Sequence, residues 1–151
     1  MTKLNYSISI NAPKDTVWHT MLDLDTYKLW TEAFFPGSYY EGSWEKGSEI
    51  RFVAEADGGK SGMLGCIVEN IPCEFVSIEY LGELENGKLK TTDGSSLWVG
   101  AHENYSFTET GGLTKLEVEL RADNGGDELT ETFDAMWPKA LQKLREMCEK
   151  V

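Results

Sequence analysis

Residues 127–151 carry the clearest periodic pattern of hydrophobic and polar positions in the chain. Apolar side chains recur there at spacings of three and four, which places them on one side of a helix. Acidic residues come early and basic residues late, as the helix dipole favours. The pattern therefore predicts one amphipathic helix, roughly 35 Å long. Its apolar positions are Leu129, Phe133, Met136, Trp137, Ala140, Leu141, Leu144, Met147 and Val151.

The rest of the chain predicts a strand, two short helices and then about six strands. Alternating apolar and polar residues over 4–10 indicate a half-buried strand. Pro13 suits the beginning of a helix, and a second short helix is predicted over 25–32. Glycine-rich turn signals separate the later strands, which are predicted over 38–44, 49–56, 62–71, 75–84, 96–108 and 113–122. Because the connections are short, the sheet should be antiparallel and should receive the final helix.

Composition narrows the class of protein. The chain has 151 residues, 40% of them hydrophobic and 11% aromatic, which predicts one globular domain over residues 1–151. Its formal net charge is −12, from 26 acidic against 14 basic residues. Such a charge repels phosphate backbones and anionic lipid surfaces, so we expect no nucleic-acid partner.

The cysteine count and the hydropathy bear on location. Cys66, Cys73 and Cys148 are odd in number, which indicates free thiols in a reducing compartment. No apolar run approaches 18 residues, so no membrane span is expected. Residues 1–10 read as a strand without the apolar core of a signal peptide. A cytoplasmic location is therefore predicted.

Several strings along the chain resemble the START-like, or SRPBCC, superfamily. They are ISINAPKDTVWHTMLDLDTYKLW, PGSYYEGSWEKGSEIRF, SGMLGCIVENIPCEFVSIEYLGEL, GAHENYSFTE, GGLTKLEVEL and DAMWPKALQKLREM, and they cover essentially the whole chain. Within the superfamily the chain resembles the homologues of the activator of heat-shock-protein ATPase. The resemblance implies an α+β helix-grip fold, in which about seven antiparallel strands wrap the C-terminal helix and two short helices close one end. Superfamily members bind apolar molecules in the cavity, act as cyclases or assist chaperones, and the fold does not choose among these.

Two aromatic segments are candidates to border such a cavity. Proline in a helix interior normally bends the helix, so Pro138 predicts a bend beside Trp137. That bend either shapes a pocket walled by Trp137 or lets the helix wrap a curved core. Trp30, Phe34 and Phe35 follow the short helices and form either a lid over the cavity or the filling of one end of the core.

The predicted strand over 96–108 carries Glu103, the main candidate in the chain for a catalytic or ligand-orienting role. Period two places Glu103 on the same face as Tyr105 and Phe107, and His102 on the opposite face. A carboxylate in an apolar cavity is costly unless it is paired or protonated. Glu103 is therefore a candidate to orient a ligand hydroxyl or to act as a base. The alternative is that Glu103 is solvent-exposed at the rim of the cavity, or that a β-bulge turns its side chain to the other face of the strand.

These arguments predict a ligand-binding cavity but no definite catalytic residue. Glu103 is the candidate if the protein is an enzyme. The predicted lining is Trp30, Phe34, Phe35, Phe52, Tyr80, Glu103, Tyr105, Phe107, Phe133 and Trp137. Two separated histidines and three unclustered cysteines make no metal-ligand pattern, and no phosphate-binding loop or nucleophile elbow is present, so we expect no metal and no cofactor.

Three functions remain open from the sequence. The first is a cytoplasmic module, rather than an enzyme, that binds an apolar or amphipathic molecule of lipid-like or polycyclic kind. The second is a cyclase or hydrolase that uses Glu103 with His102 or Tyr80. The third is a co-chaperone, for which the family resemblance is the only support. The oligomeric state is left open.

Overall fold

The computed structural model describes residues 2–34, 37–56, 59–85, 88–90, 100–122 and 126–150. The chain begins with strand β1 (Thr2–Ile10), followed by helices α1 (Lys14–Leu22) and α2 (Leu24–Trp30) and the 3-10 turn η1 (Thr31–Ala33). The strands that follow are β2 (Tyr39–Gly42), β3 (Glu49–Ala56), β4 (Gly59–Ile71), β5 (Phe75–Glu85), β6 (Lys88–Lys90), β7 (His102–Thr110) and β8 (Leu113–Ala122). The last element is helix α3 (Gly126–Glu149).

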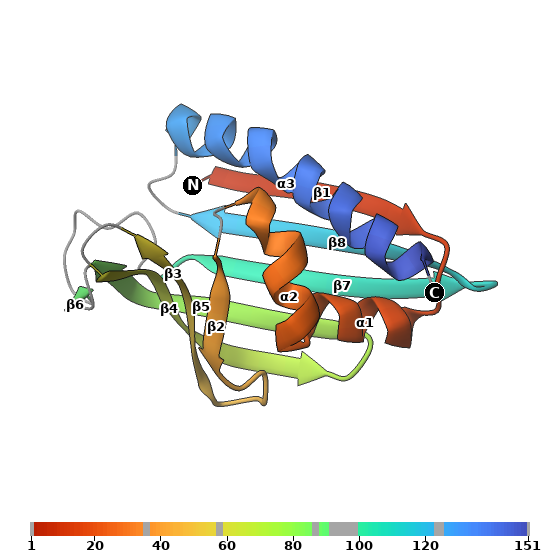
Figure 1. Cartoon of the computed structure of the whole chain (residues 1–151), viewed down its shortest axis with the longest axis horizontal. Helices are drawn as coiled ribbons and strands as arrows, with labels where there is room; N and C mark the ends of the chain where they lie inside the picture. The colour runs from red at the N-terminus through yellow and green to blue at the C-terminus, as the bar shows by residue number, and fades with distance from the viewer. Residues whose placement is uncertain are drawn as a thin grey trace.

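The strands form one antiparallel sheet, with β1 at one edge and β2 at the other. Seven strands follow the order β1-β8-β7-β5-β4-β3-β2, and the short β6 pairs with β5. The helices gather on one face, with α3 packed along β1 and α1 against β7 and β8 (Figure 1). Strand β2 contacts α2 at the other end of the sheet. The predicted α+β helix-grip fold is confirmed.

Helix α3 buries the stripe that its periodicity predicted. Trp137, Ala140, Leu141 and Leu144 are buried, and Cys148 joins them one turn after Leu144. The helix continues through Pro138, so the proline does not end it. The bend expected there stays a prediction. Leu129 and Val151 lie outside the side chains that the structure describes.

Strand β7 follows the predicted alternation. Glu103, Tyr105 and Phe107 are buried, whereas the intervening Asn104 and Ser106 are partly exposed. Glu103 pairs with Leu120 of β8 and Ile78 of β5 in regular register, so no bulge reverses its direction. The carboxylate therefore faces the helices, and the alternative of a wet position at the rim is not what the structure has.

Some element boundaries differ from the sequence prediction. Strand β2 is shorter than 38–44 because Gly42 takes a φ of +118° and lies against the Glu49 carbonyl, which ends the regular strand. The first part of the strand predicted over 96–108 lies outside the described residues. Strand β6 was not predicted. A Cβ on Gly62 would lie 1.8 Å from the Phe52 carbonyl oxygen, so glycine is what lets β3 and β4 approach there.

In the described part of the chain, no helix is both long and apolar enough to cross a membrane. The same residues contain no group of three or more acidic, histidine or cysteine side chains placed to hold a metal ion.

Candidate functional site

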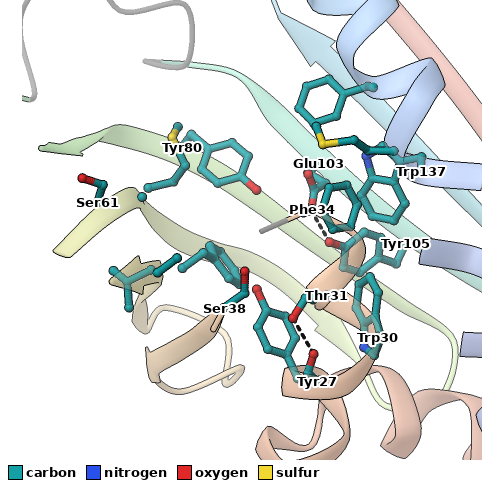
Figure 2. A pocket seen from close by; sticks show the side chains of 17 residues that line it. Tyr27, Trp30, Thr31, Phe34, Ser38, Ser61, Tyr80, Glu103, Tyr105 and Trp137 are labelled. Atoms are coloured by element: carbon teal, nitrogen blue, oxygen red, sulfur yellow. Dashed lines mark hydrogen bonds between the residues drawn. The ribbon is translucent and has the colours of Figure 1, made fainter. Parts of the chain in front are cut away.

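A pocket of about 510 Å³ lies between the sheet and the helices. Strands β3, β4, β5 and β7 form one side, and α2, η1 and α3 form the other (Figure 2). Its lining consists of Tyr27, Trp30, Thr31, Phe34, Ser38, Phe52, Val53, Ala54, Ser61, Gly62, Met63, Tyr80, Glu103, Tyr105, Phe133, Met136 and Trp137. The volume is within the range of small-molecule sites, and aromatic rings dominate the walls.

The structure brings most of the predicted cavity residues together. Trp30, Phe34, Phe52, Tyr80, Glu103, Tyr105, Phe133 and Trp137 all line the pocket. Phe35 lies outside the described residues. These side chains come from six separate elements or loops, so only the folded chain assembles them.

Phe107 is placed elsewhere. Its ring packs edge-on against Trp18 of α1, with the ring centroids 5.2 Å apart, and it does not line the pocket. The two-residue alternation of a strand predicted the correct face of β7 for Phe107, and the side chain is buried there. Phe107 does not reach the pocket because of its position along the strand. At this end of β7, α1 covers the strand and fills the space that the pocket occupies nearer Glu103.

Trp137 is the centre of the aromatic wall. Its ring contacts those of Phe34, Trp30, Tyr105 and Tyr6, at centroid distances of 4.9, 6.1, 6.1 and 6.2 Å. Aromatic pairs in this range attract each other beyond their burial of apolar area. The four partners come from β1, α2, β7 and the loop after η1. One side chain of α3 therefore ties the helix to the sheet and to the short helices.

The two buried tryptophans differ in their polar ends. The Trp30 indole nitrogen donates a hydrogen bond of 3.0 Å to the Met21 carbonyl oxygen. The Trp137 indole nitrogen is buried and has no hydrogen-bond partner among the described residues. An unpaired buried donor costs free energy, so the stabilising contribution of Trp137 comes from its ring and not from its indole nitrogen.

Glu103 is the one carboxylic acid in the described lining. Its side chain is 8% exposed. The Tyr105 hydroxyl donates a hydrogen bond to Glu103 Oε2, and Tyr80 is a second hydrogen-bond partner of the carboxylate. Burial raises the pKa of Glu103 from 4.5 to about 7, and these two hydrogen bonds limit the rise because they favour the charged form.

The carboxylate is surrounded by phenols and lacks a cationic partner in the described lining. Burial, followed by the field of Glu103, raises the pKa of Tyr27, Tyr80 and Tyr105. All three hydroxyls are therefore protonated near neutral pH and can act as donors. No lysine, arginine or histidine is among the described lining residues. His102 points to the opposite face of β7, away from Glu103.

Sequence reasoning missed part of the lining. Tyr27 lies three residues before Trp30 on α2, so a helical stripe through the two rings was the available signal. Ser38, Ser61 and Met63 carried no comparable signal, because only the folded chain brings these separate segments to the pocket.

The opposite face of the sheet carries a polar network that also involves β7. Asn104 accepts a hydrogen bond from Ser77 and donates one of 3.2 Å to Glu119. Glu119 also pairs with Arg121 at 2.9 Å and with Lys3 at 3.2 Å. Burial opposes ionisation of Glu119, but hydrogen bonds from Arg121, Lys3 and Asn104 outweigh it and lower its pKa. Glu119 therefore has cationic partners on the outer face, whereas the described lining around Glu103 contains none.

Fold and pocket together define a START-like domain, a fold that serves ligand-binding and polyketide-cyclase-like domains in general. The chain belongs to the family of activator of Hsp90 ATPase homolog 1-like proteins, which it matches over residues 11–149. The resemblance read from the sequence is confirmed. No curated protein sequence matches the chain significantly.

Solved structures share the fold at low sequence identity. The Aha1 dimer from Colwellia psychrerythraea is 18% identical, with a TM-score of 0.73 over 99% of this chain and 97% of that one. Protein MLL2253 from Mesorhizobium loti is 14% identical, with a TM-score of 0.74 over 99% and 98% of the two chains. DynU16, from the dynemicin biosynthetic locus, is 16% identical, with a TM-score of 0.69 over 97% of this chain and 47% of that one.

Proposed function

We propose that this protein binds an apolar or amphipathic small molecule, lipid-like or polycyclic, in the pocket between the sheet and α3. The observation that carries the proposal is an aromatic pocket of about 510 Å³ with one buried acid and a few hydroxyls. Largely apolar walls with few, convergent polar groups are typical of sites that bind and orient small molecules. We expect the protein to work in the cytoplasm, where its free thiols would stay reduced.

Filling the pocket should abolish this binding. Ala54 lines the pocket, so Ala54→Phe places a ring where the ligand would lie. We expect the variant to bind the neutral fluorescent probe N-phenyl-1-naphthylamine at least tenfold more weakly than the unaltered protein, as measured by fluorescence titration. Mass spectrometry of solvent extracts of both proteins would identify any co-purified ligand.

The same substitution at Ala135 is the matched control. Ala135 is exposed on α3 and does not line the pocket, so Ala135→Phe should leave probe binding unchanged. Equal binding by all three proteins would place the probe outside the pocket. Absence of both probe binding and an extractable ligand would contradict the proposed function.

A specific observation also supports a second function, an enzyme of the cyclase kind. Glu103 has a pKa of about 7, which suits a general base at neutral pH, and the Tyr80 and Tyr105 hydroxyls converge on it. In such a reaction Glu103 would remove a proton from the carbon beside a ketone. A tyrosine hydroxyl would donate a hydrogen bond to the enolate oxygen. The enolate carbon would then attack a second carbonyl carbon of the same molecule, which closes the ring, and the new alkoxide oxygen would take the proton from Glu103. The fold likeness to DynU16, from a biosynthetic locus, is compatible with this chemistry.

Hydrogen–deuterium exchange tests the enzymatic alternative directly. In deuterated buffer the protein should accelerate exchange at the carbon beside the carbonyl of 2-tetralone, followed by NMR. Glu103→Gln should lower the protein-catalysed rate at least about 100-fold, the usual contribution of a positioned base. Glu119→Gln, on the outer face of the sheet, should leave the rate unchanged. A rate insensitive to Glu103→Gln would remove the enzymatic reading.

The third hypothesis, that the protein binds a partner as a co-chaperone does, is supported only by the family relationship. It requires an exposed docking patch. The large exposed apolar side chains that the structure describes are spread over α2, β4 and the start of β8: Leu24, Leu29, Val68, Ile71 and Leu113. They do not argue for a particular partner.

A further inference from the structure

We propose that the ligand of the pocket carries a positively charged amine, which pairs with Glu103 and lies against the surrounding aromatic rings. The inference rests on the proposed small-molecule binding function and names the class of ligand. Three features support it: an acid without a cationic partner in the described lining, the aromatic rings around that acid, and the charge of the whole chain.

The first feature is the incomplete environment of Glu103. A buried carboxylate is costly unless it is paired and hydrogen-bonded. Tyr105 and Tyr80 supply hydrogen bonds to it, but the described lining supplies no positive charge. Glu119 shows how the same sheet satisfies an acid elsewhere, because it has Arg121 and Lys3 as partners. A ligand amine would give Glu103 the cationic partner that the described lining does not supply.

The second feature is the arrangement of rings around the acid. In Figure 2, the hydroxyl ends of Tyr80 and Tyr105 approach Glu103 from different directions. The Trp137 ring packs against those of Tyr105 and Phe34. The face of an aromatic ring attracts a cation within about 6 Å, and the attraction grows when water is excluded. Several rings with one acid are a typical environment for an organic ammonium group, whose apolar remainder would contact Phe52 and Met63 at the sheet side of the pocket.

The third feature is charge, which disfavours the alternative ligand classes. The chain carries a net charge of −12, and the described lining contains an acid but no base. An anionic ligand would meet repulsion and would need Glu103 to be protonated. A neutral ligand would use the rings but would leave the ionised acid without a counter-charge.

The ionisation of Glu103 gives the ligand classes different pH dependences. The other titratable groups in the described lining are Tyr27 from α2, Tyr80 from β5 and Tyr105 on β7, and all three stay protonated well above neutrality. Because the pKa of Glu103 is about 7, the acid is mostly neutral at pH 6 and mostly ionised at pH 8. An amine that needs the ionised acid should bind up to about tenfold tighter at pH 8 than at pH 6.

Three compounds with one ring system test the inference: naphthalen-2-ylmethylamine, naphthalen-2-ylmethanol and 2-naphthoic acid. They present a cation, a neutral hydroxyl and an anion on the same apolar body. At pH 8 we expect the amine to bind about tenfold tighter than the alcohol, since hydrogen bonds between charged groups are stronger than neutral ones, and the acid to bind most weakly. Calorimetric titration at pH 6 and pH 8 gives the affinities.

Glu103→Gln should abolish the preference for the amine and its pH dependence, while the alcohol still binds. Glu119→Gln should change neither. Binding of the alcohol tests the proposed function, that the pocket holds a small molecule. The ratio of the amine affinity to the alcohol affinity tests the inference that the ligand carries an amine. Equal affinities, a preference for 2-naphthoic acid, or an amine preference that survives Glu103→Gln would overturn the inference alone. Absence of binding by all three compounds would overturn the inference, and it would overturn the proposed function as well if the fluorescent probe and the solvent extracts also showed no ligand.

Discussion

Replacing Glu103 with glutamine should stabilise the folded protein at pH 8 by up to about 3 kcal/mol. The pKa of this acid is about 7 in the fold, against 4.5 for its ordinary value. Each pKa unit corresponds to about 1.4 kcal/mol of difference between folded and unfolded states. Above neutral pH the unaltered protein holds an ionised carboxylate in an apolar pocket. Glutamine keeps the shape and accepts the tyrosine hydrogen bonds without that charge.

The sign of the pH dependence follows from proton binding. Between about pH 4.5 and pH 7 the folded state holds a proton on Glu103 that the unfolded state has released. Stability therefore falls as pH rises through this window and levels off above it. At pH 4.5 the protonated acid resembles glutamine, so the two proteins should differ little. Urea unfolding curves at several values of pH would measure the growing difference.

Glu119→Gln is the matched control, because it makes the same substitution on the outer face of the same sheet. Cationic partners lower the pKa of Glu119, so its ionised form contributes stability at neutral pH that is lost as pH falls. This variant should be slightly less stable than the unaltered protein at pH 8. If Glu103→Gln were also less stable at pH 8, the carboxylate would have a counter-charge in the fold, and the argument for a cationic ligand would lose its first support.

A residue that lowers the stability of its own fold is informative about function. Local rules are broken mainly at functional sites, where stability is exchanged for binding or chemistry. Leucine, isoleucine or valine fills the neighbouring inward positions Leu120, Ile78 and Val76 of the same sheet. An acid among them, at the wall of a pocket, fits a role toward a ligand better than a role in packing.

The fold could be predicted from the sequence because each element carries its own period. The stripe of α3 marked Trp137, Leu141 and Leu144 as buried, and the structure buries all three. Alternation in β7 left Glu103 either inward or at a solvent-exposed rim, and the structure has it buried. Boundaries were less accurate where the backbone, rather than side-chain polarity, ends an element. Gly42 ends β2 through its conformation and its contact with Glu49, which periodicity does not register.

The pocket could be predicted only in part, because periodicity gives the face of a strand but not the depth along it. Tyr105 and Phe107 share a face of β7, yet one lines the pocket and the other packs under α1. That difference depends on where α1 and α3 cross the sheet. The raised pKa of Glu103 likewise depends on burial by elements that are far apart in the sequence, which periodicity along one strand does not register.

Trp137→Ala should be the most destabilising single substitution at the pocket, with a loss of about 3–5 kcal/mol in the free energy of unfolding. Trp137 is 2% exposed and contacts rings from β1, α2, β7 and the loop after η1. Alanine would leave a cavity at the point where these elements meet α3. Chemical denaturation followed by circular dichroism would measure the loss. Met136→Ala, at the neighbouring and half-buried position, should cost much less.

Trp137→Phe distinguishes the contribution of the aromatic ring to stability from that of the indole nitrogen. Phenylalanine keeps an aromatic side chain against Phe34 and removes a buried donor that has no partner in the described structure. The lost volume and the removed unsatisfied group act in opposite directions, so this variant should lose less than half the stability that Trp137→Ala loses. Because the nitrogen is shielded, probe binding should persist in Trp137→Phe. An equal loss of stability in both variants would show that the nitrogen has a partner, and that Trp137 contributes a polar contact as well as the ring that joins α3 to the sheet.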